Sequence, residues 1–275
     1  MAHGGYPVRY CNAKRPTNDP RRVYFFRSRN DVVTSISKVP KNFDQLAADL
    51  GIEFDNGDIQ QLGLYLDLLL ETNKQFNLTA IKTSEEAWTR HILDSISLIP
   101  SLAKENVEHV VDVGSGGGLP GIPLAITMPE VTFTLVETTQ KKAMFLSHAV
   151  QALDLENVTV ISERAENLAT KDGGFREIAD AVIARAVGPL NVLLELTIPF
   201  AKIDGVVLAI KGERAPVEVE EARKALHVLK AEVESSVRTT TGTILTIRKT
   251  DATPKKYPRL PGEPKRLPIG KGEKR

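Results

Sequence analysis

An acid followed by alternating glycines marks the part of this chain that is best suited to hold a small molecule. Within the stretch VVDVGSGGGLPGIP, residues 110–123, Asp112 precedes Gly114, Gly116 and Gly118 at intervals of two. Glycines let a backbone approach a ligand closely where a Cβ would block it, and a carboxylate beside them favours a cationic group. The stretch therefore predicts a ligand site, and leaves open whether that ligand carries phosphate.

The register of the glycines against the preceding apolar run separates two classes of cofactor. Three glycines fit the dinucleotide pattern G-x-G-x-x-G, namely Gly116, Gly118 and Gly121. The apolar run ends at Val113, so the tight turn starts at Gly114, and counted from there the third glycine falls on Leu119. In that register the stretch resembles the first motif of S-adenosylmethionine methyltransferases. Their cofactor has a sulfonium and an ammonium group but no pyrophosphate.

A second acid, Glu137, follows the apolar run that ends at Val136. A carboxylate there can accept hydrogen bonds from both hydroxyls of a ribose, although dinucleotide-binding folds also place an acid at this point. Each acid has a purely structural alternative. In that alternative Asp112 caps the turn and Glu137 is an acid at a helix N-terminus.

Short apolar runs alternate with helical patterns from residue 109 onward. The predicted strands are 109–113, 132–136, 158–161, 179–183, 206–210, 231–238 and 243–249. The helical stretches between them are 119–127, 139–153, 190–200 and 216–229. The alternation predicts an α/β fold with a Rossmann-like, mostly parallel sheet, and the last two strands, joined at Thr241-Gly242, predict an antiparallel hairpin at its edge.

The region before the sheet has a helical pattern. Apolar residues recur on one helical face at Ile59, Leu62, Leu66 and Leu69, and a further helix is expected from Thr83 or Ser84, with a side-chain cap, to about residue 98. The expected organisation is a basic extension over 1–42, a helical subdomain over 43–104, a cofactor-binding domain over 105–250 and a basic, proline-rich tail over 251–275.

The two ends of the chain are basic although the net charge is only +1. Residues 1–42 hold nine Lys and Arg against two acids, and residues 254–275 hold eight against two. Such ends favour a polyanionic partner, with solvated tails as the alternative. Residues 1–42 are expected to be mostly disordered. This segment has three possible roles: a transit peptide, an RNA-binding arm, or a stretch that precedes an internal translation start at Val32 or Val33. The third is favoured.

Composition narrows the remaining possibilities. The single Cys11 excludes an internal disulfide framework, and the five histidines show no spacing typical of a metal site. No apolar run reaches the ~18 residues of a membrane span, and no secretory signal is recognisable. We therefore expect no metal, no membrane contact, and a cytoplasmic protein, or an organellar one if residues 1–42 are a transit peptide. A monomer is expected.

Several motifs taken together are much more specific than the glycine turn. In chain order they are FNLTAI (76–81), RHILDS (90–95), the glycine stretch (112–123), RAE (164–166), ARAV (184–187), KG (211–212) and KYPR (256–259). This combination resembles the bacterial guanine-N7 methyltransferases of small-subunit ribosomal RNA, also called the glucose-inhibited division protein B family. The resemblance covers about residues 43–249 and extends to the KYPR tail.

The resemblance implies a Rossmann-like class I methyltransferase and adds residues to the site. The predicted cofactor-binding residues are Asp112, Gly114, Gly116, Gly118, Leu119, Glu137, Ala165, Glu166 and Arg185. The predicted substrate-binding residues are Asn77, His91, Asp94 and Arg185. Ala165 and Glu166 are implied to border the adenine. Where this family often has Asp-Ser after the second strand the chain has Glu137-Thr138, one methylene longer.

Two of these residues have structural alternatives. For Arg185 the alternative is a salt bridge to a nearby acid such as Asp180, and for His91 it is a half-buried, hydrogen-bonded histidine. An arginine at the C-terminal end of a parallel strand faces the ligand crevice of such folds, which favours a functional Arg185.

The implied reaction needs no catalytic base, because guanine N7 carries a free lone pair at neutral pH. Alignment and electrostatics would then supply the catalysis. The sequence lacks the Asn/Asp-Pro-Pro-aromatic motif typical of amino-group methylation, and has no cysteine in its folded region. The implied partner is small-subunit ribosomal RNA, free or in the assembled subunit. Two rival functions are an NAD-dependent oxidoreductase and a non-catalytic RNA-binding module on a methyltransferase fold.

Overall fold

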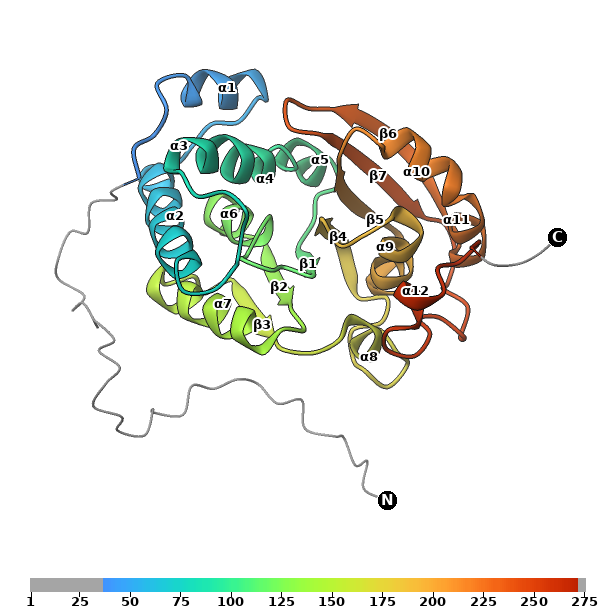
Figure 1. The fold of residues 1–275 in the computed structure, drawn as a ribbon. Helices are drawn as coiled ribbons and strands as arrows, with labels where there is room; N and C mark the ends of the chain where they lie inside the picture. The colour runs from blue at the N-terminus through green and yellow to red at the C-terminus, as the bar shows by residue number, and fades with distance from the viewer. Residues whose placement is uncertain (1–36, 272–275) are drawn as a thin grey trace, which may run out of the picture.

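The computed structural model describes residues 37–271, and they form a seven-stranded sheet with helices on both faces (Figure 1). The strands are β1 His109–Val113, β2 Thr132–Val136, β3 Val158–Ile161, β4 Ala179–Arg185, β5 Ala201–Lys211, β6 Ala231–Arg238 and β7 Thr243–Lys249. Each predicted strand is confirmed. The expected disorder of residues 1–42 falls mostly outside the described residues. Within the described part, Ser37 donates its N–H and its hydroxyl to Asp67.

The strand order, β3-β2-β1-β4-β5-β7-β6, confirms a mostly parallel sheet with an antiparallel edge. Strands β1 to β5 pair in parallel, whereas β7 runs antiparallel to both β5 and β6. The order reverses between β1 and β4, which is the point where open α/β sheets bind their ligands, outside the carboxyl ends of the strands. Paired residues Val113 and Val136 put the ends of β1 and β2 level there.

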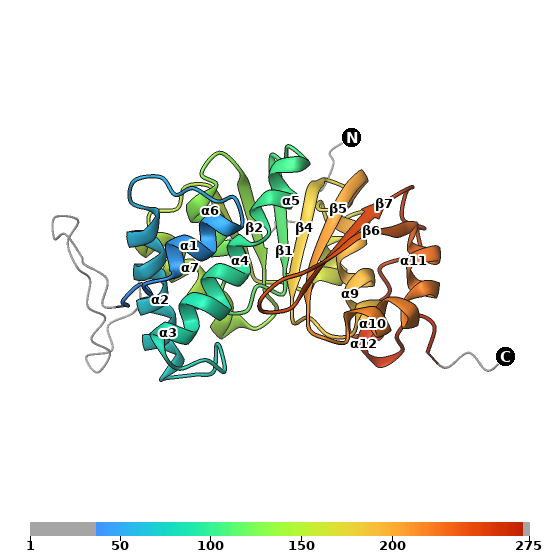
Figure 2. The ribbon, with the colours of Figure 1, turned by 90° about the horizontal axis from the view of Figure 1, so that it is seen from above.

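Two hydrophobic cores lie on opposite faces of the sheet. Helices α1 to α7 gather on one side and α9 to α12 on the other (Figure 2). The first group comprises α1 Phe43–Asp49, α2 Asp58–Asn73, α3 Ser84–Ala87, α4 Asp94–Ile96, α5 Ile99–Lys104, α6 Gly121–Thr127 and α7 Gln140–Ala152. The later helices are α8 Ala165–Leu168, α9 Leu190–Thr197, α10 Ala215–Glu221, α11 Arg223–Leu229 and α12 Glu263–Arg266.

The N-terminal helices share a core with the sheet. Leu62, Leu66 and Leu69 of α2 are buried, as their helical spacing predicted, and Tyr65 between them donates its hydroxyl to the carbonyl of Gly117 at 2.7 Å. Burial of these side chains ties the helical region to the glycine turn, since each fully buried apolar side chain stabilises packing by roughly 1.5–3 kcal/mol.

The helix expected from residue 83 or 84 to 98 is present as one interrupted run. It starts as α3, widens into a π-helix over Trp88–Leu93, and continues as α4. Thr83 occupies the N-cap position without a side-chain capping bond, so the predicted cap is wrong. A π-helical insertion shifts the side chains that follow it, and such insertions often occur at functional sites.

The C-terminal segment, residues 251–271, docks on the face of the sheet that α9 to α12 cover. We call it the strap. It runs past α9 and α8 before the chain ends (Figure 1), and Thr253, Tyr257, Pro264 and Ile269 are buried. Arg176, just before β4, donates to the carbonyl of Tyr257 at 2.7 Å. No helix within residues 37–271 has the length and apolar character to cross a membrane.

Candidate active site

The glycine turn begins at Gly114, as the end of the preceding apolar run predicted. Directly after β1, Gly114 has φ +75° and donates its N–H to the carbonyl of Val136 at 2.8 Å. A positive φ of this size favours glycine. A Cβ on Gly114 would also lie 3.1 Å from the side chain of Val187, in the loop after β4. The backbone therefore runs close against the opposite wall, as a cradle for a ligand requires.

Asp112 lies beneath this turn, fully buried. Its Oδ2 accepts the N–H of Gly121 at the start of α6, at 3.2 Å. A Cβ on Gly121 would come within 2.7 Å of that oxygen, so the close approach of α6 to β1 needs glycine here. Burial raises the pKa of Asp112 to about 7. Its other oxygen has no hydrogen-bond partner within the described part of the chain. The turn-capping role is thus realised, and one oxygen remains available.

Glu137 is buried against the same turn. Its Oε2 accepts the N–H of Gly116 at 2.9 Å, and its Oε1 accepts the N–H of Thr139, the residue before α7, at 2.6 Å. Each carboxylate oxygen can accept a second bond, so the predicted ribose contact stays a prediction. The acid joins the ends of β1 and β2 into one rigid rim.

Arg185, at the end of β4, lies among the predicted substrate-binding residues. Its guanidinium donates to Asp94 Oδ2 at 3.1 Å and to the carbonyl of Arg90 at 3.0 Å. The structural alternative, a salt bridge to a nearby acid, is therefore present, but the acid is Asp94; Asp180, at the start of β4, pairs with Lys202 at 2.7 Å. Strand β4 is seven residues long, with Asp180 at its second position and Arg185 at its last, so the two side chains lie near opposite edges of the sheet.

Asp94 and His91 are fixed by partners from both sides. The hydroxyl of Thr241, in the turn between β6 and β7, donates to the second oxygen of Asp94. The His91 ring lies between the Arg90 carbonyl, 3.0 Å from Nδ1, and the Thr79 hydroxyl, 2.7 Å from Nε2. Burial, reinforced by the charge of Arg185, lowers the pKa of His91 to about 4. The ring is therefore neutral at pH 7 and satisfied by protein groups.

The loop that carries Asn77 is shaped by Asn73, a residue that the motif analysis did not single out. The Asn73 side chain accepts the N–H groups of Leu78 and Thr79 at 2.8 and 3.0 Å and donates to the Thr79 carbonyl at 2.9 Å. Asn77 itself is exposed. Asn73 is the last residue of α2 and lies four residues before the NLT motif, and an asparagine so close to that motif is the signal that was available.

The loop after β4 is held by a buried lysine. Lys211, at the end of β5, donates to the carbonyl of Gly188 at 2.6 Å and pairs with Glu218 of α10 at 2.7 Å. Glu218 also accepts the N–H of Leu190. This arrangement explains why a lysine and glycine follow β5 in the motif set: the lysine fixes the loop whose Val187 faces Gly114.

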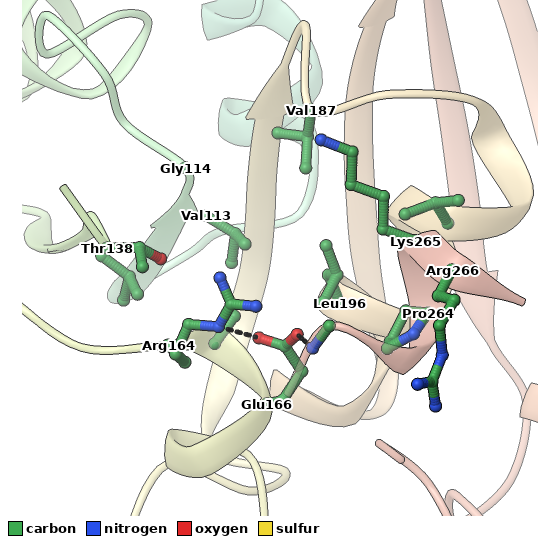
Figure 3. Close-up of a pocket in the computed structure, with 14 residues that line it drawn as sticks. Val113, Gly114, Thr138, Arg164, Glu166, Val187, Leu196, Pro264, Lys265 and Arg266 are labelled. Atoms are coloured by element: carbon green, nitrogen blue, oxygen red, sulfur yellow. Dashed lines mark hydrogen bonds and ion pairs between the residues drawn. The ribbon is translucent and has the colours of Figure 1, made fainter. Parts of the chain in front are cut away.

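A cavity of about 410 Å³ opens at the switch point of the sheet (Figure 3). Its wall consists of Val113, Gly114, Val136, Thr138, Arg164, Ala165, Glu166, Val187, Val192, Leu196, Gly262, Pro264, Lys265 and Arg266. Of the predicted cofactor-binding residues, Gly114, Ala165 and Glu166 reach this wall. The others support it: Asp112, Gly116, Gly118, Leu119 and Glu137 build the turn, and Arg185 belongs to the neighbouring Asp94 cluster.

The cavity fits S-adenosylmethionine better than a dinucleotide. Its volume is near the lower end for small-molecule sites, and the acid beneath the turn keeps an oxygen without a partner. The turn begins in the methyltransferase register at Gly114. Sequence reasoning missed two parts of the wall. One is α9 with Val192 and Leu196, and the other is the strap with Gly262 to Arg266.

Comparison with known proteins decides the family. A family model described as rRNA small subunit methyltransferase G (GidB) matches residues 58–246. The chain belongs to this family. A ribosomal RNA small subunit methyltransferase G from Sorangium cellulosum is 45% identical over 222 residues, 80% of this chain and 91% of that protein. Another from Bacillus mycoides is 39% identical over 241 residues, 84% and 99% of the two chains.

A solved structure supports the fold separately. A methyltransferase from Geobacter sulfurreducens superposes with a TM-score of 0.50 at 14% identity, over 76% of this chain and 98% of that one. Family membership makes this chain an rRNA methyltransferase with S-adenosylmethionine as its cofactor. The predicted family, fold, enzyme class and cofactor are confirmed, and the oxidoreductase and the non-catalytic module lose their support.

Proposed function

We propose that the chain methylates N7 of a guanine in small-subunit ribosomal RNA. The observation that carries the proposal is that the Arg185–Asp94 pair lies at the end of β4, directly before the loop whose Val187 forms part of the cavity wall. Guanine N7 needs no deprotonation before methyl transfer. The charged groups beside the cavity are engaged with each other, and the neutral His91 has both nitrogens occupied, which fits a reaction that requires no general base.

The protein's own residues would act by placement. S-adenosylmethionine supplies a methyl group made electrophilic by its sulfonium. Gly114 and Val187 narrow the cavity between β1 and β4, so a bound ligand lies against backbone and apolar side chains and excludes water there. Arg185, fixed by Asp94, presents a rigid donor at the cavity edge, suited to an acceptor on a guanine ring. Alignment of this kind accounts for large rate effects without covalent participation.

The rim of the cavity is suited to a polyanion. Arg164, Lys265 and Arg266 belong to its wall, and the Lys265 side chain extends toward Val187 (Figure 3). Lysines placed this way neutralise phosphates and position RNA without reading its sequence. Because N7 of a paired guanine lies in the deep groove of A-form RNA, we propose a target in a loop or at another exposed site.

The proposal includes three finer points. The substrate is the RNA free or in the assembled small subunit, the enzyme acts as a monomer, and it works in the cytoplasm, where the bacterial relatives would meet ribosomal subunits. The contacts of Asn77, His91, Asp94 and Arg185 with RNA, and of the turn residues with the cofactor, belong to the same proposal.

The test is methyl transfer in vitro. Purified protein is incubated with labelled S-adenosylmethionine and with unmodified small subunits or naked ribosomal RNA, and the digested nucleosides are identified by mass spectrometry. We expect N7-methylguanosine. Whichever of the two reactions, with small subunits or with naked RNA, incorporates more label identifies the substrate. Label in a different nucleoside contradicts the N7 assignment. Cofactor binding without transfer to either RNA contradicts the substrate.

A further inference from the structure

The strap supplies one side of the cavity. Gly262, Pro264, Lys265 and Arg266 all lie on its wall, and Pro264 is buried. In Figure 3, Pro264 and Lys265 lie across the hollow from Val113, whereas the Arg266 side chain points away from it. The strap lies beyond residues 58–246, the part that matches the family model. The residues that match the family model therefore form only part of the pocket wall.

One helix both lines the cavity and anchors the strap. Val192 and Leu196 of α9 face the cavity, whereas Asn191 and Glu195 face the strap. Residues at spacings of four share a helical face, so these two pairs form adjacent stripes. Any movement of the strap on α9 therefore changes the cavity wall directly.

The anchor is a two-pronged ion pair in the interior. Glu195 has no exposed surface, and Arg259 reaches it with Nε at 2.8 Å and Nη2 at 2.6 Å. The backbone N–H of Arg259 adds a third bond at 3.0 Å. Removing one partner of such a buried pair leaves an uncompensated charge. This cost holds the strap in one position on α9.

A second anchor lies at the cavity itself. Glu166, at the start of α8, accepts the N–H of Gly262 at 2.8 Å and is itself buried. The resemblance implied that Glu166 borders the adenine. One of its oxygens is instead bonded to the strap, so the strap stands at the same end of the cavity as Ala165 and Glu166.

We propose that the strap is a cofactor-binding element, with Gly262 and Pro264 forming the wall against the adenosine end of S-adenosylmethionine. The inference rests on the proposed site, because the adenosine end is assigned through Ala165 and Glu166. If the strap contacts the cofactor only when docked, then cofactor binding and strap docking stabilise each other by the same free energy.

Limited proteolysis of the full chain measures this coupling. Trypsin cleaves after exposed lysine and arginine, and the strap offers Lys255, Lys256 and Lys265. We expect S-adenosylmethionine to slow cleavage at these sites, with half-maximal protection at its Kd. S-adenosylhomocysteine should protect as well, because it keeps the adenosine. Lys104, exposed at the end of α5 ahead of β1 and so at the opposite edge of the sheet, is the internal control site.

Paired variants test the contact. Pro264→Asp places a charge in the wall and should raise the Kd for S-adenosylmethionine, measured by calorimetry, roughly tenfold or more. Pro261→Asp changes an exposed proline of the same strap and should leave the Kd within about twofold. Pro264→Ala removes contact area without charge and should fall between them. Thermal unfolding of each variant shows that the fold persists.

The possible results distinguish failure of the strap's proposed role from failure of the proposed guanine-N7 activity. Equal Kd values for the wild type and both Pro264 variants, or no protection of the strap at saturating cofactor, would overturn the strap's role while leaving methyl transfer intact. A protected strap together with methylation at a position other than guanine N7 would instead overturn the proposed function and leave the strap's role standing.

Discussion

The glycine turn and the strap form opposite walls of one cavity, yet they are specified in different ways. The turn follows β1 directly, its positive φ angles come from its own glycines, and the nearest of its longer-range partners, Val136 and Glu137, lie at the end of the adjacent strand. The strap reaches the cavity from the far end of the chain, and its place depends on Glu195 and Glu166, 64 and 96 residues away in sequence. A short motif can be recognised from the sequence, whereas a wall formed by residues far apart in the chain cannot.

This difference makes the two walls respond differently to substitution. A change in the turn strains the backbone locally, so it costs some stability and alters the ligand site directly. A change in the strap acts through docking on α9 and α8, and its effect depends on how far docking is lost. The following predictions test that contrast, beginning with the largest effect.

Gly114→Asp should abolish cofactor binding. The substitution forces a side chain into a left-handed conformation, at a cost on the order of 1–3 kcal/mol, and its Cβ would approach Val187 at 3.1 Å. The side chain would then enter the cavity. We expect the Kd for S-adenosylmethionine to rise by more than about 100-fold in calorimetry.

Gly51→Asp is the matched control. Gly51 has φ +74°, nearly the same as Gly114, but a Cβ there meets nothing within 4 Å, and the residue lies between α1 and α2. It should cost similar backbone strain and leave the Kd unchanged. If both variants lost binding equally, general destabilisation rather than the turn would be responsible.

Asp94→Asn should lower turnover while sparing the cofactor. The substitution removes the charge that fixes Arg185, and misplacement of a positioning group can cost on the order of 100-fold in rate. We expect kcat to fall by about that factor, with the Kd for S-adenosylmethionine within about twofold. Steady-state methylation at saturating substrates measures kcat, and calorimetry measures the Kd.

Asp180→Asn provides the comparison at the other end of the same strand. It breaks the pair with Lys202, which is partly exposed and so contributes only about 0–1 kcal/mol. Its kcat should remain near the wild-type value. Equal losses in both variants would mean that Arg185 has no special place in the reaction.

Asp112→Asn should change how stability depends on pH. The pKa of Asp112 rises from 3.8 unfolded to about 7 folded, so the native state holds the extra proton between pH 4 and 7 and wild-type stability is lost as pH rises through that window. The variant lacks this loss. Its stability relative to wild type should therefore increase from pH 4 to 7, by about 1.4 kcal/mol for each pKa unit.

Urea unfolding at pH 4.5 and pH 7, without cofactor, measures the difference. His91 titrates in an overlapping window, but its pKa is lowered, so its contribution has the opposite sign and is the same in both proteins. A difference between variant and wild type that is independent of pH would show that Asp112 is ionised in the folded state.

Sequence alone predicted what local patterns determine. Most strand bounds followed from apolar runs, and the start of the turn at Gly114 followed from the end of β1. Strand β5 begins at Ala201 rather than at residue 206, and its first part was missed because the exposed Lys202 and Asp204 are not part of an apolar run. The partners of Arg185 did not follow, because Asp94 lies 91 residues away and comes into reach only through the π-helical run. Composition made the C-terminal segment appear to be a basic tail, since nothing in it indicates a buried Glu195 on α9.

The smallest expected effect concerns the charged rim of the strap. Lys265→Gln removes a cation that extends from the cavity wall toward Val187. If it contacts an RNA phosphate, binding to the small subunit should weaken roughly fivefold, about 1 kcal/mol, and the slope of log K against log salt should decrease by about 1. Lys104→Gln, at the opposite edge of the sheet, should alter neither quantity.

The same variant distinguishes the two roles of the strap. Gly262 and Pro264 face inward and are assigned to the cofactor, whereas Lys265 is exposed at the rim and assigned to RNA. Its substitution should therefore leave the Kd for S-adenosylmethionine unchanged. A weaker cofactor affinity with an unaltered salt slope would place the Lys265 ammonium on the cofactor instead, and the strap would then serve one ligand rather than two.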